Sequence, residues 1–185
     1  MSTITNEDKL LKLLAVAVVE NPRSTIKELA ESVGISKATL HRFCGTRENL
    51  GIMLAQKAEE ALNNIISTAE KDFDDYKDGM SQLIRAHLDN QELLRMTCSP
   101  QSSIEDDWSP YLKAIDTFFL KAQKQGAFRI DFSAQVLSEL FVSSICGMID
   151  AQRRSRVASS GLPETFEDFF LHGVLNQIET ATINL

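Results

Sequence analysis

A short segment near the N-terminus concentrates side chains that donate hydrogen bonds. These donors are Ser36, Lys37, Thr39, His41 and Arg42. From Ser36 to Arg47 the chain carries three cations (Lys37, Arg42 and Arg47) and no acid. Hydroxyl, imidazole, ammonium and guanidinium groups bind phosphate oxygens and the edges of bases. The segment therefore has the chemistry of a local surface that reads nucleic acid.

Such a surface has to be held on a helix, and residues 25–43 have the spacing of a helix-turn-helix. Thr25 and Glu28 form a capping box that opens a short helix ending near residue 32. Gly34 suits the turn, which needs a positive φ, and Ser36 caps the next helix, to about residue 43. The small core between the two helices is predicted to contain Leu29, Ala30, Val33, Ile35, Leu40 and Phe43.

Longer helices flank this motif. Residues 7–20 have apolar side chains at helical spacing, and Asn21-Pro22 stops that helix. Thr46 can cap a long helix that runs to about residue 71. We therefore expect residues 1–50 to form a three-helix DNA-binding domain. The long helix would join it to a second domain, residues 51–185.

The second domain also has a helical pattern. Helices are predicted at about 77–97, 107–125, 133–155 and 163–182, with Gly126 as a left-handed cap. Sustained alternation of apolar and polar residues, which would indicate strands, is not found in the sequence. The predicted fold class is all-α.

The charge of the chain is unevenly distributed. The net charge is −7 and the isoelectric point is about 5.0. Residues 1–50 hold seven Lys and Arg against six acids, whereas the remaining 135 residues hold twelve against twenty. An acidic chain does not coat nucleic acid, but it can carry one local surface that reads DNA.

The run ISKATLHRFCGTRENL, residues 35–50, resembles the N-terminal domain of the tetracycline-repressor (TetR) family. The resemblance implies that the helix at 36–43 enters the major groove and that Ser36 to Arg42 contact bases and backbone. It implies phosphate contacts from Thr25 and Arg47, and a helical C-terminal domain for dimerisation and ligand sensing. The segment from Gly126 to Asp131 also looks like a linker common in that family.

Three positions at the end of the predicted recognition helix depart from the family pattern, as do Glu20 and Asn21, which stand where the family commonly has a glycine-aromatic pair. His41 stands where the family has tyrosine, Phe43 stands at a histidine position, and Cys44 replaces a core phenylalanine. The large aromatic side chain is thus one position early, which rotates it by about 100° on a helix. Either Phe43 is exposed at the DNA face, or the end of the helix is rewound so that Phe43 enters the core.

Two further surfaces are predicted in the C-terminal domain. Small residues recur every four positions at Ser143, Gly147 and Ala151, and with Phe170 they suggest a helical dimer interface, although the same helices could pack internally. An interior site for a small effector is suggested by four residues of the helices at 77–97 and 107–125. These residues are His87, Trp108, Tyr111 and Phe118.

Other functional classes lack support in the sequence. Three widely spaced cysteines and three scattered histidines predict neither a disulfide framework nor a metal site, and no catalytic motif or cofactor loop is found. The sequence contains no run of eighteen apolar residues, so it does not predict a membrane span. Three cysteines far apart in the chain fit a protein of the reducing cytoplasm.

The sequence therefore predicts a homodimeric, cytoplasmic transcriptional regulator that is not an enzyme. We expect it to act as a repressor that leaves its operator DNA when a small molecule binds. The alternative is a helical ligand-binding or adaptor protein whose helix-turn-helix does not bind DNA.

Overall fold

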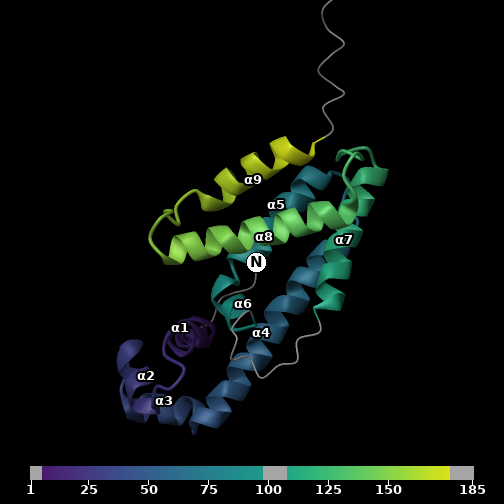
Figure 1. Cartoon of the computed structure of the whole chain (residues 1–185). Coiled ribbons are helices and arrows are strands. Elements are labelled where there is room, and N and C mark those ends of the chain that lie inside the picture. The colour runs from purple at the N-terminus through teal and green to yellow at the C-terminus, as the bar shows by residue number, and fades with distance from the viewer. Residues whose placement is uncertain (1–5, 98–107, 176–185) are drawn as a thin grey trace, which may run out of the picture. The chain divides into compact units, whose positions relative to one another are not determined.

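The computed structural model describes residues 6–97 and 108–175, which form nine helices (Figure 1). Within these residues no strand occurs, and Phe128 and Leu175 form an isolated backbone bridge. The predicted all-α fold is confirmed. The helices are α1 (Asn6–Glu20), α2 (Ile26–Ser32), α3 (Lys37–Cys44), α4 (Arg47–Glu70), α5 (Tyr76–Leu88), α6 (Gln91–Thr97), α7 (Ser109–Lys124), α8 (Ala134–Arg153) and α9 (Leu162–Val174).

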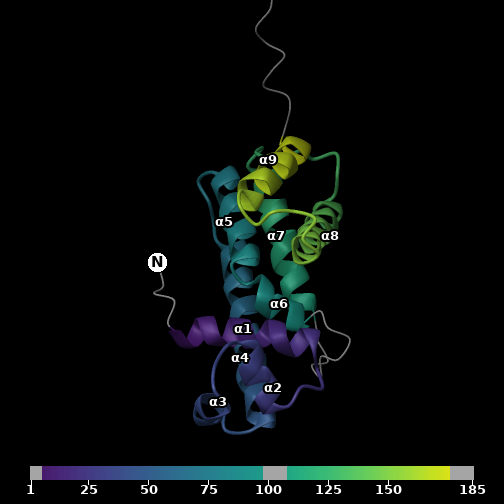
Figure 2. The same cartoon turned by 90° about the vertical axis from the view of Figure 1, so that its left-hand side faces the viewer.

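The chain divides into two compact units, of which the first contains the helix-turn-helix. This unit holds α1, α2, α3, the part of α4 up to Asn63, and α6. Figure 2 shows α1 lying across the first half of α4, with α6 above it and α2 and α3 below. Leucines from four helices are fully buried in its core: Leu14, Leu29, Leu40, Leu50 and Leu54.

Helix α6 belongs to the core of this first unit although it is distant in sequence. Leu93 is 1% exposed and packs in the same apolar cluster as the buried residues of α1 to α4. Helices α1 and α6 are in direct contact. The helix-turn-helix unit therefore draws part of its core from a segment outside residues 1–50.

Replacing Leu93 by alanine should lower the free energy of unfolding by about 2–5 kcal/mol, because the cavity would open inside a packed core. The control is Leu13→Ala on α1, where the side chain is 55% exposed and the change should cost about 0.5 kcal/mol or less. Urea denaturation followed by circular dichroism measures both values. Equal costs for the two variants would contradict the assignment of α6 to this core.

The second unit contains the end of α4 from Asn64 together with α5, α7, α8 and α9. Its core is rich in aromatic rings that meet edge to face, such as Phe118 and Tyr76, whose centroids are 5.4 Å apart. Gly79 allows α5 to approach this cluster, since a Cβ atom there would lie 2.8 Å from the Phe73 ring. Helices α8 and α9 are neighbours in this unit (Figure 1).

Two predicted helices differ from the observed ones. The helix expected at 77–97 is two helices, because the chain passes from the second unit to the first between Asp89 and Asn90. The helix expected at 163–182 ends at Val174, because Leu175 has extended backbone angles and forms the bridge with Phe128. The rest of that prediction, residues 176–182, lies outside the described residues.

Candidate nucleic-acid interface

Local interactions fix the start of α3 and the exposure of its donors. The Ser36 hydroxyl oxygen accepts a hydrogen bond of 3.0 Å from the Thr39 backbone N–H, which confirms the predicted cap. Leu40 and Cys44 fill the buried side of the helix. Lys37, His41 and Arg42 remain exposed, whereas Thr39 is half-buried and its Oγ1 lies 2.9 Å from Ser36 Oγ. The structure therefore brings these five donors together on one short helix and its cap.

Phe43, at the end of α3, is neither fully exposed at the DNA face nor fully buried in the core, the two alternatives that the sequence left open. Phe43 is half-buried and packs against the edge of the core cluster. Cys44 occupies the fully buried position, and its thiol donates to the Leu40 carbonyl at 3.2 Å. Burial raises the pKa of the Cys44 thiol, which favours the protonated form. Helix α3 stays regular to Cys44 and ends at Gly45, with φ 71°.

The predicted capping box at the start of α2 is confirmed. The Thr25 backbone N–H and hydroxyl donate to the Glu28 carboxylate at 2.7 and 2.9 Å, and the Glu28 backbone N–H donates to Thr25 Oγ1 at 3.3 Å. These bonds lower the pKa of the Glu28 carboxyl. Thr25 is exposed, but its hydroxyl proton is engaged by Glu28, so a contact with a phosphate would have to compete with that carboxylate.

Arg47 lies at the first position of α4, beside the turn that precedes α2. Its Nη2 donates to the Pro22 carbonyl at 3.5 Å, and the side chain is half-buried. Thr46 caps α4, since its Oγ1 accepts from the Asn49 backbone N–H at 3.1 Å. The guanidinium is therefore held at the same end of the first unit as the α1–α2 turn.

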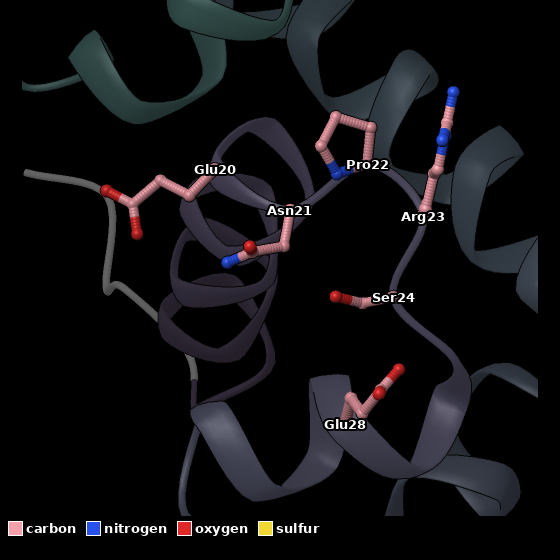
Figure 3. A pocket seen from close by; sticks show the side chains of 6 residues that line it. All are labelled: Glu20, Asn21, Pro22, Arg23, Ser24 and Glu28. Carbon is pink, nitrogen blue, oxygen red and sulfur yellow. The ribbon is translucent and has the colours of Figure 1, made fainter.

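A hollow of about 700 Å³ lies between the end of α1 and the start of α2. Figure 3 shows the side chains that line it, with Ser24 and Glu28 directed towards the space between the two helices. The lining residues are Glu20, Asn21, Pro22, Arg23, Ser24 and Glu28. Five of the six lining residues have polar or charged side chains, and none of the six is among the predicted effector residues.

Comparison with known proteins agrees with this geometry. A model of winged helix-turn-helix DNA-binding domains matches residues 9–45. The HTH-type transcriptional regulator NfxB of Pseudomonas aeruginosa is 45% identical over 183 residues, covering 95% of this chain and 98% of that protein. The TetR-family regulator PfmR from Thermus thermophilus has a TM-score of 0.62 at 19% identity, covering 94% of this chain and 100% of that one. The MbdR regulator from Azoarcus sp. CIB has a TM-score of 0.66 at 16% identity, covering 92% and 100%.

This chain belongs to the family of the HTH-type transcriptional regulator NfxB. Its fold resembles that of TetR-family regulators. It is a DNA-binding regulator, and its helix-turn-helix consists of α2 and α3.

Three of the four predicted effector residues of this regulator lie together in the second unit. His87 on α5 is buried, and its Nε2 lies 2.8 Å from the Tyr111 hydroxyl on α7. The Trp108 ring lies 5.7 Å from the Tyr111 ring. Phe118 instead packs in the cluster with Phe73 and Tyr76.

The hydrogen bonds of His87 define its neutral tautomer. The Leu83 carbonyl, 2.7 Å from Nδ1, can only accept, so Nδ1 carries the proton and Nε2 accepts from the Tyr111 hydroxyl. Burial lowers the pKa of His87 to about 4, an effect that the bond to Leu83 partly opposes. The ring is therefore neutral at physiological pH.

This regulator should lose stability in acid because His87 is buried in its neutral form. In the unfolded chain the histidine pKa is about 6.5, so the stabilisation is complete above that pH and is lost as pH falls towards 4. At about 1.4 kcal/mol per pH unit, moving from pH 7 to pH 5 should cost the wild type about 2 kcal/mol more than His87→Gln. Urea unfolding of both proteins at the two pH values measures the difference. The same loss in both would show that His87 does not cause it.

The predicted dimer residues of the regulator divide between surface and core. Ser143 and Gly147 on α8 are exposed and Ala151 is half-buried. Phe170 was expected at this surface and is instead 6% exposed, with its ring 5.3 Å from that of Phe141. The reason is its four-residue spacing from Phe166 and Val174, which form the buried face of α9.

Further exposed apolar residues extend this surface, of which Val136 and Leu140 were not predicted from the sequence. Val136 and Leu140 continue the exposed row of Ser143 and Gly147 towards the start of α8, and Phe169 on α9 is 72% exposed. The spacing of 136, 140, 143 and 147 is the helical period, so the signal was present in the sequence.

Among the described residues α8 is the one helix long and apolar enough to span a membrane, and its inner side packs in the core through residues such as Phe141. A helix covered on both faces in a soluble assembly has the same composition.

Proposed function

We propose that this regulator binds a near-palindromic operator as a homodimer and represses transcription until a small apolar or amphipathic molecule releases it. DNA reading is assigned to residues 1–50, and effector sensing and dimerisation to residues 51–185. The observation that carries the proposal is the acid-free, exposed donor face of α3 in a chain of net charge −7. Such a chain repels DNA everywhere except where cations gather.

The DNA contacts follow from exposure and donor type. Lys37, His41 and Arg42 would reach base edges and phosphates from the exposed face of α3, and Ser36 and Thr39 would approach the groove at its first turn. Thr25 and Arg47 would bind flanking phosphates. At Thr25 this requires the phosphate to displace Glu28 from the hydroxyl.

A homodimer is proposed because one recognition helix makes too few contacts for tight, specific binding, whereas two-fold pairing doubles them. The exposed row of α8, with Ser143 and Gly147, would pack against a second copy, and Ala151 lies at its end. Phe169 takes the place first given to Phe170.

Effector binding is proposed near His87, Tyr111 and Trp108, with Phe118 forming part of the deeper wall. The response would be transmitted by α4, whose 24 residues span about 36 Å at about 1.5 Å per residue. A tilt of about 10° would move one end by several ångströms relative to the other, enough to separate two recognition helices from successive major grooves. The effector has to favour the tilted state by about 1–3 kcal/mol.

A gel shift with DNA flanking the gene of this chain tests repressor binding. We expect a specific protein–DNA complex in this assay without any added cofactor. We also propose that the protein acts in the cytoplasm and is not an enzyme. Native mass spectrometry of the purified protein should then identify a bound small molecule. Linkage requires that operator DNA weaken the binding of that molecule by the same factor by which the molecule weakens operator binding. If calorimetric titrations give the same affinity for the small molecule with and without operator DNA, that molecule is not the inducer. If the gel shift shows no DNA complex at all, the alternative function, a ligand-binding adaptor, is favoured.

A further inference from the structure

The loop between α7 and α8 is held rigidly and presents an apolar side chain to solvent. Ile130 is 80% exposed, the highest value among the large exposed hydrophobic residues described. We infer that Ile130 is an anchor of the homodimer and that Arg129 is the residue that positions it. This inference rests on the proposed dimer and assigns it a contact outside the helices.

Arg129 makes the loop rigid through contacts on several sides. Its Nε donates to Asp131 Oδ1 at 2.6 Å, and its Nη2 is paired with Asp131 Oδ2. Its Nη1 donates to the Gly173 carbonyl at 3.2 Å, and its backbone N–H donates to the Val174 carbonyl at 2.8 Å. The guanidinium also stacks over the Phe132 ring, 4.4 Å from its centroid.

The far side of the loop is fixed by α7. The Gln123 side-chain amide donates to the carbonyls of Arg129 and Phe132, both at 2.8 Å. The loop around Ile130 is therefore bound to the end of α9 through Arg129 and to α7 through Gln123. A side chain held in solvent in this way is preorganised, so a partner that covers it loses little conformational entropy on binding.

The loop is continuous with the exposed apolar surface of α8 and α9. Arg129 bonds to Gly173, one turn beyond Phe169 on α9, and Phe132 lies just before the start of α8 and four residues before Val136. We define these exposed apolar residues, Ile130, Phe132, Val136, Leu140 and Phe169, as the patch. Exposed apolar patches mark interaction sites.

A second copy of this chain is the partner we assign to the patch, because the patch extends the surface of α8 and α9 that the proposed dimer uses. The patch carries two strongly exposed apolar side chains, Ile130 and Phe169. An interface with two-fold symmetry uses the same surface on both copies. Two chains of charge −7 repel each other, so they meet where charge is sparse. Glu139 is the one charged residue exposed on α8 from Val136 to Gly147.

Sedimentation equilibrium of the full chain tests the inference. Ile130→Ser should raise the dissociation constant of the dimer about tenfold or more, since each dimer loses two buried isoleucines. Arg129→Ala should weaken the dimer in the same direction, because Ile130 is then no longer held. The matched control is Leu120→Ser, which removes an exposed leucine from α7 outside the patch and should leave the constant unchanged. Circular dichroism melting should be unaltered by Ile130→Ser because that side chain makes little contact within its own copy.

The outcomes separate this inference from the proposed function. A dimeric wild type with an Ile130→Ser variant of the same dissociation constant would overturn the anchor and leave the α8 and α9 dimer intact. Equal weakening by Leu120→Ser would also overturn it, since the effect would then not be specific to the loop. A monomeric wild type would overturn both the anchor and the dimer.

Discussion

Replacing Gly147 by leucine should convert the dimer into monomers and abolish operator binding. Inside one copy the new side chain enters open space, and leucine has a higher helix propensity than glycine by about 0.8–1 kcal/mol. The monomer should therefore be at least as stable as before. In the dimer the same side chain would collide with the helix of the partner that approaches this position, and overpacking of this kind typically costs about 1–3 kcal/mol at each site.

Analytical ultracentrifugation and an operator gel shift on the same samples measure this result. Gln82→Leu is the matched control, because it places a leucine at an exposed position of α5 and should leave both dimer and complex unchanged. A Gly147→Leu protein that remains fully dimeric would locate the interface elsewhere on the chain.

Removing the two cations of α3 should weaken DNA binding by about one to two orders of magnitude at moderate salt. Lys37→Ala combined with Arg42→Ala takes away two exposed donors and leaves the buried side of the helix intact. The slope of log K against log salt should become shallower by about 0.9 for each phosphate that the variant no longer neutralises. Fluorescence anisotropy with labelled operator at several salt concentrations gives both quantities.

A double variant at the end of α8 serves as the electrostatic control. Arg153→Ala with Arg154→Ala removes the same formal charge from an exposed site outside the helix-turn-helix, where both side chains pair with Asp150. It should leave the affinity and the slope close to the wild type. If the two double variants behave alike, binding depends on total charge and α3 does not form a specific interface.

The parts of the fold that depend on near neighbours could be predicted from the sequence. The caps at Thr25 and Ser36 and the positive φ angles of Gly34 and Gly126 are set within a few residues, and all four are confirmed. The donors of α3 are exposed for the same reason, because the buried positions Leu40 and Cys44 fix the orientation of a short helix.

The parts that depend on distant segments could not be predicted. The pattern from 77 to 97 is helical throughout, and its division at Asp89 and Asn90 arises because Leu93 enters the core of the other unit. Phe169 and Phe170 are equivalent by residue type, and they differ in the structure because the Phe170 ring packs against Phe141 of α8. The loop that carries Ile130 is bonded to α9 through Arg129 and Gly173, which are forty-four residues apart in the chain.

The central claim, that α3 reads a specific two-fold site on DNA, is tested most directly by selection from a random DNA pool with the purified full-length protein. The account predicts enrichment of one near-palindrome whose half-site centres lie about one helical turn apart or further. It also predicts that the Lys37→Ala, Arg42→Ala protein enriches nothing under the same conditions. A wild-type protein that enriches no sequence above the starting pool, even at low salt, would contradict the claim.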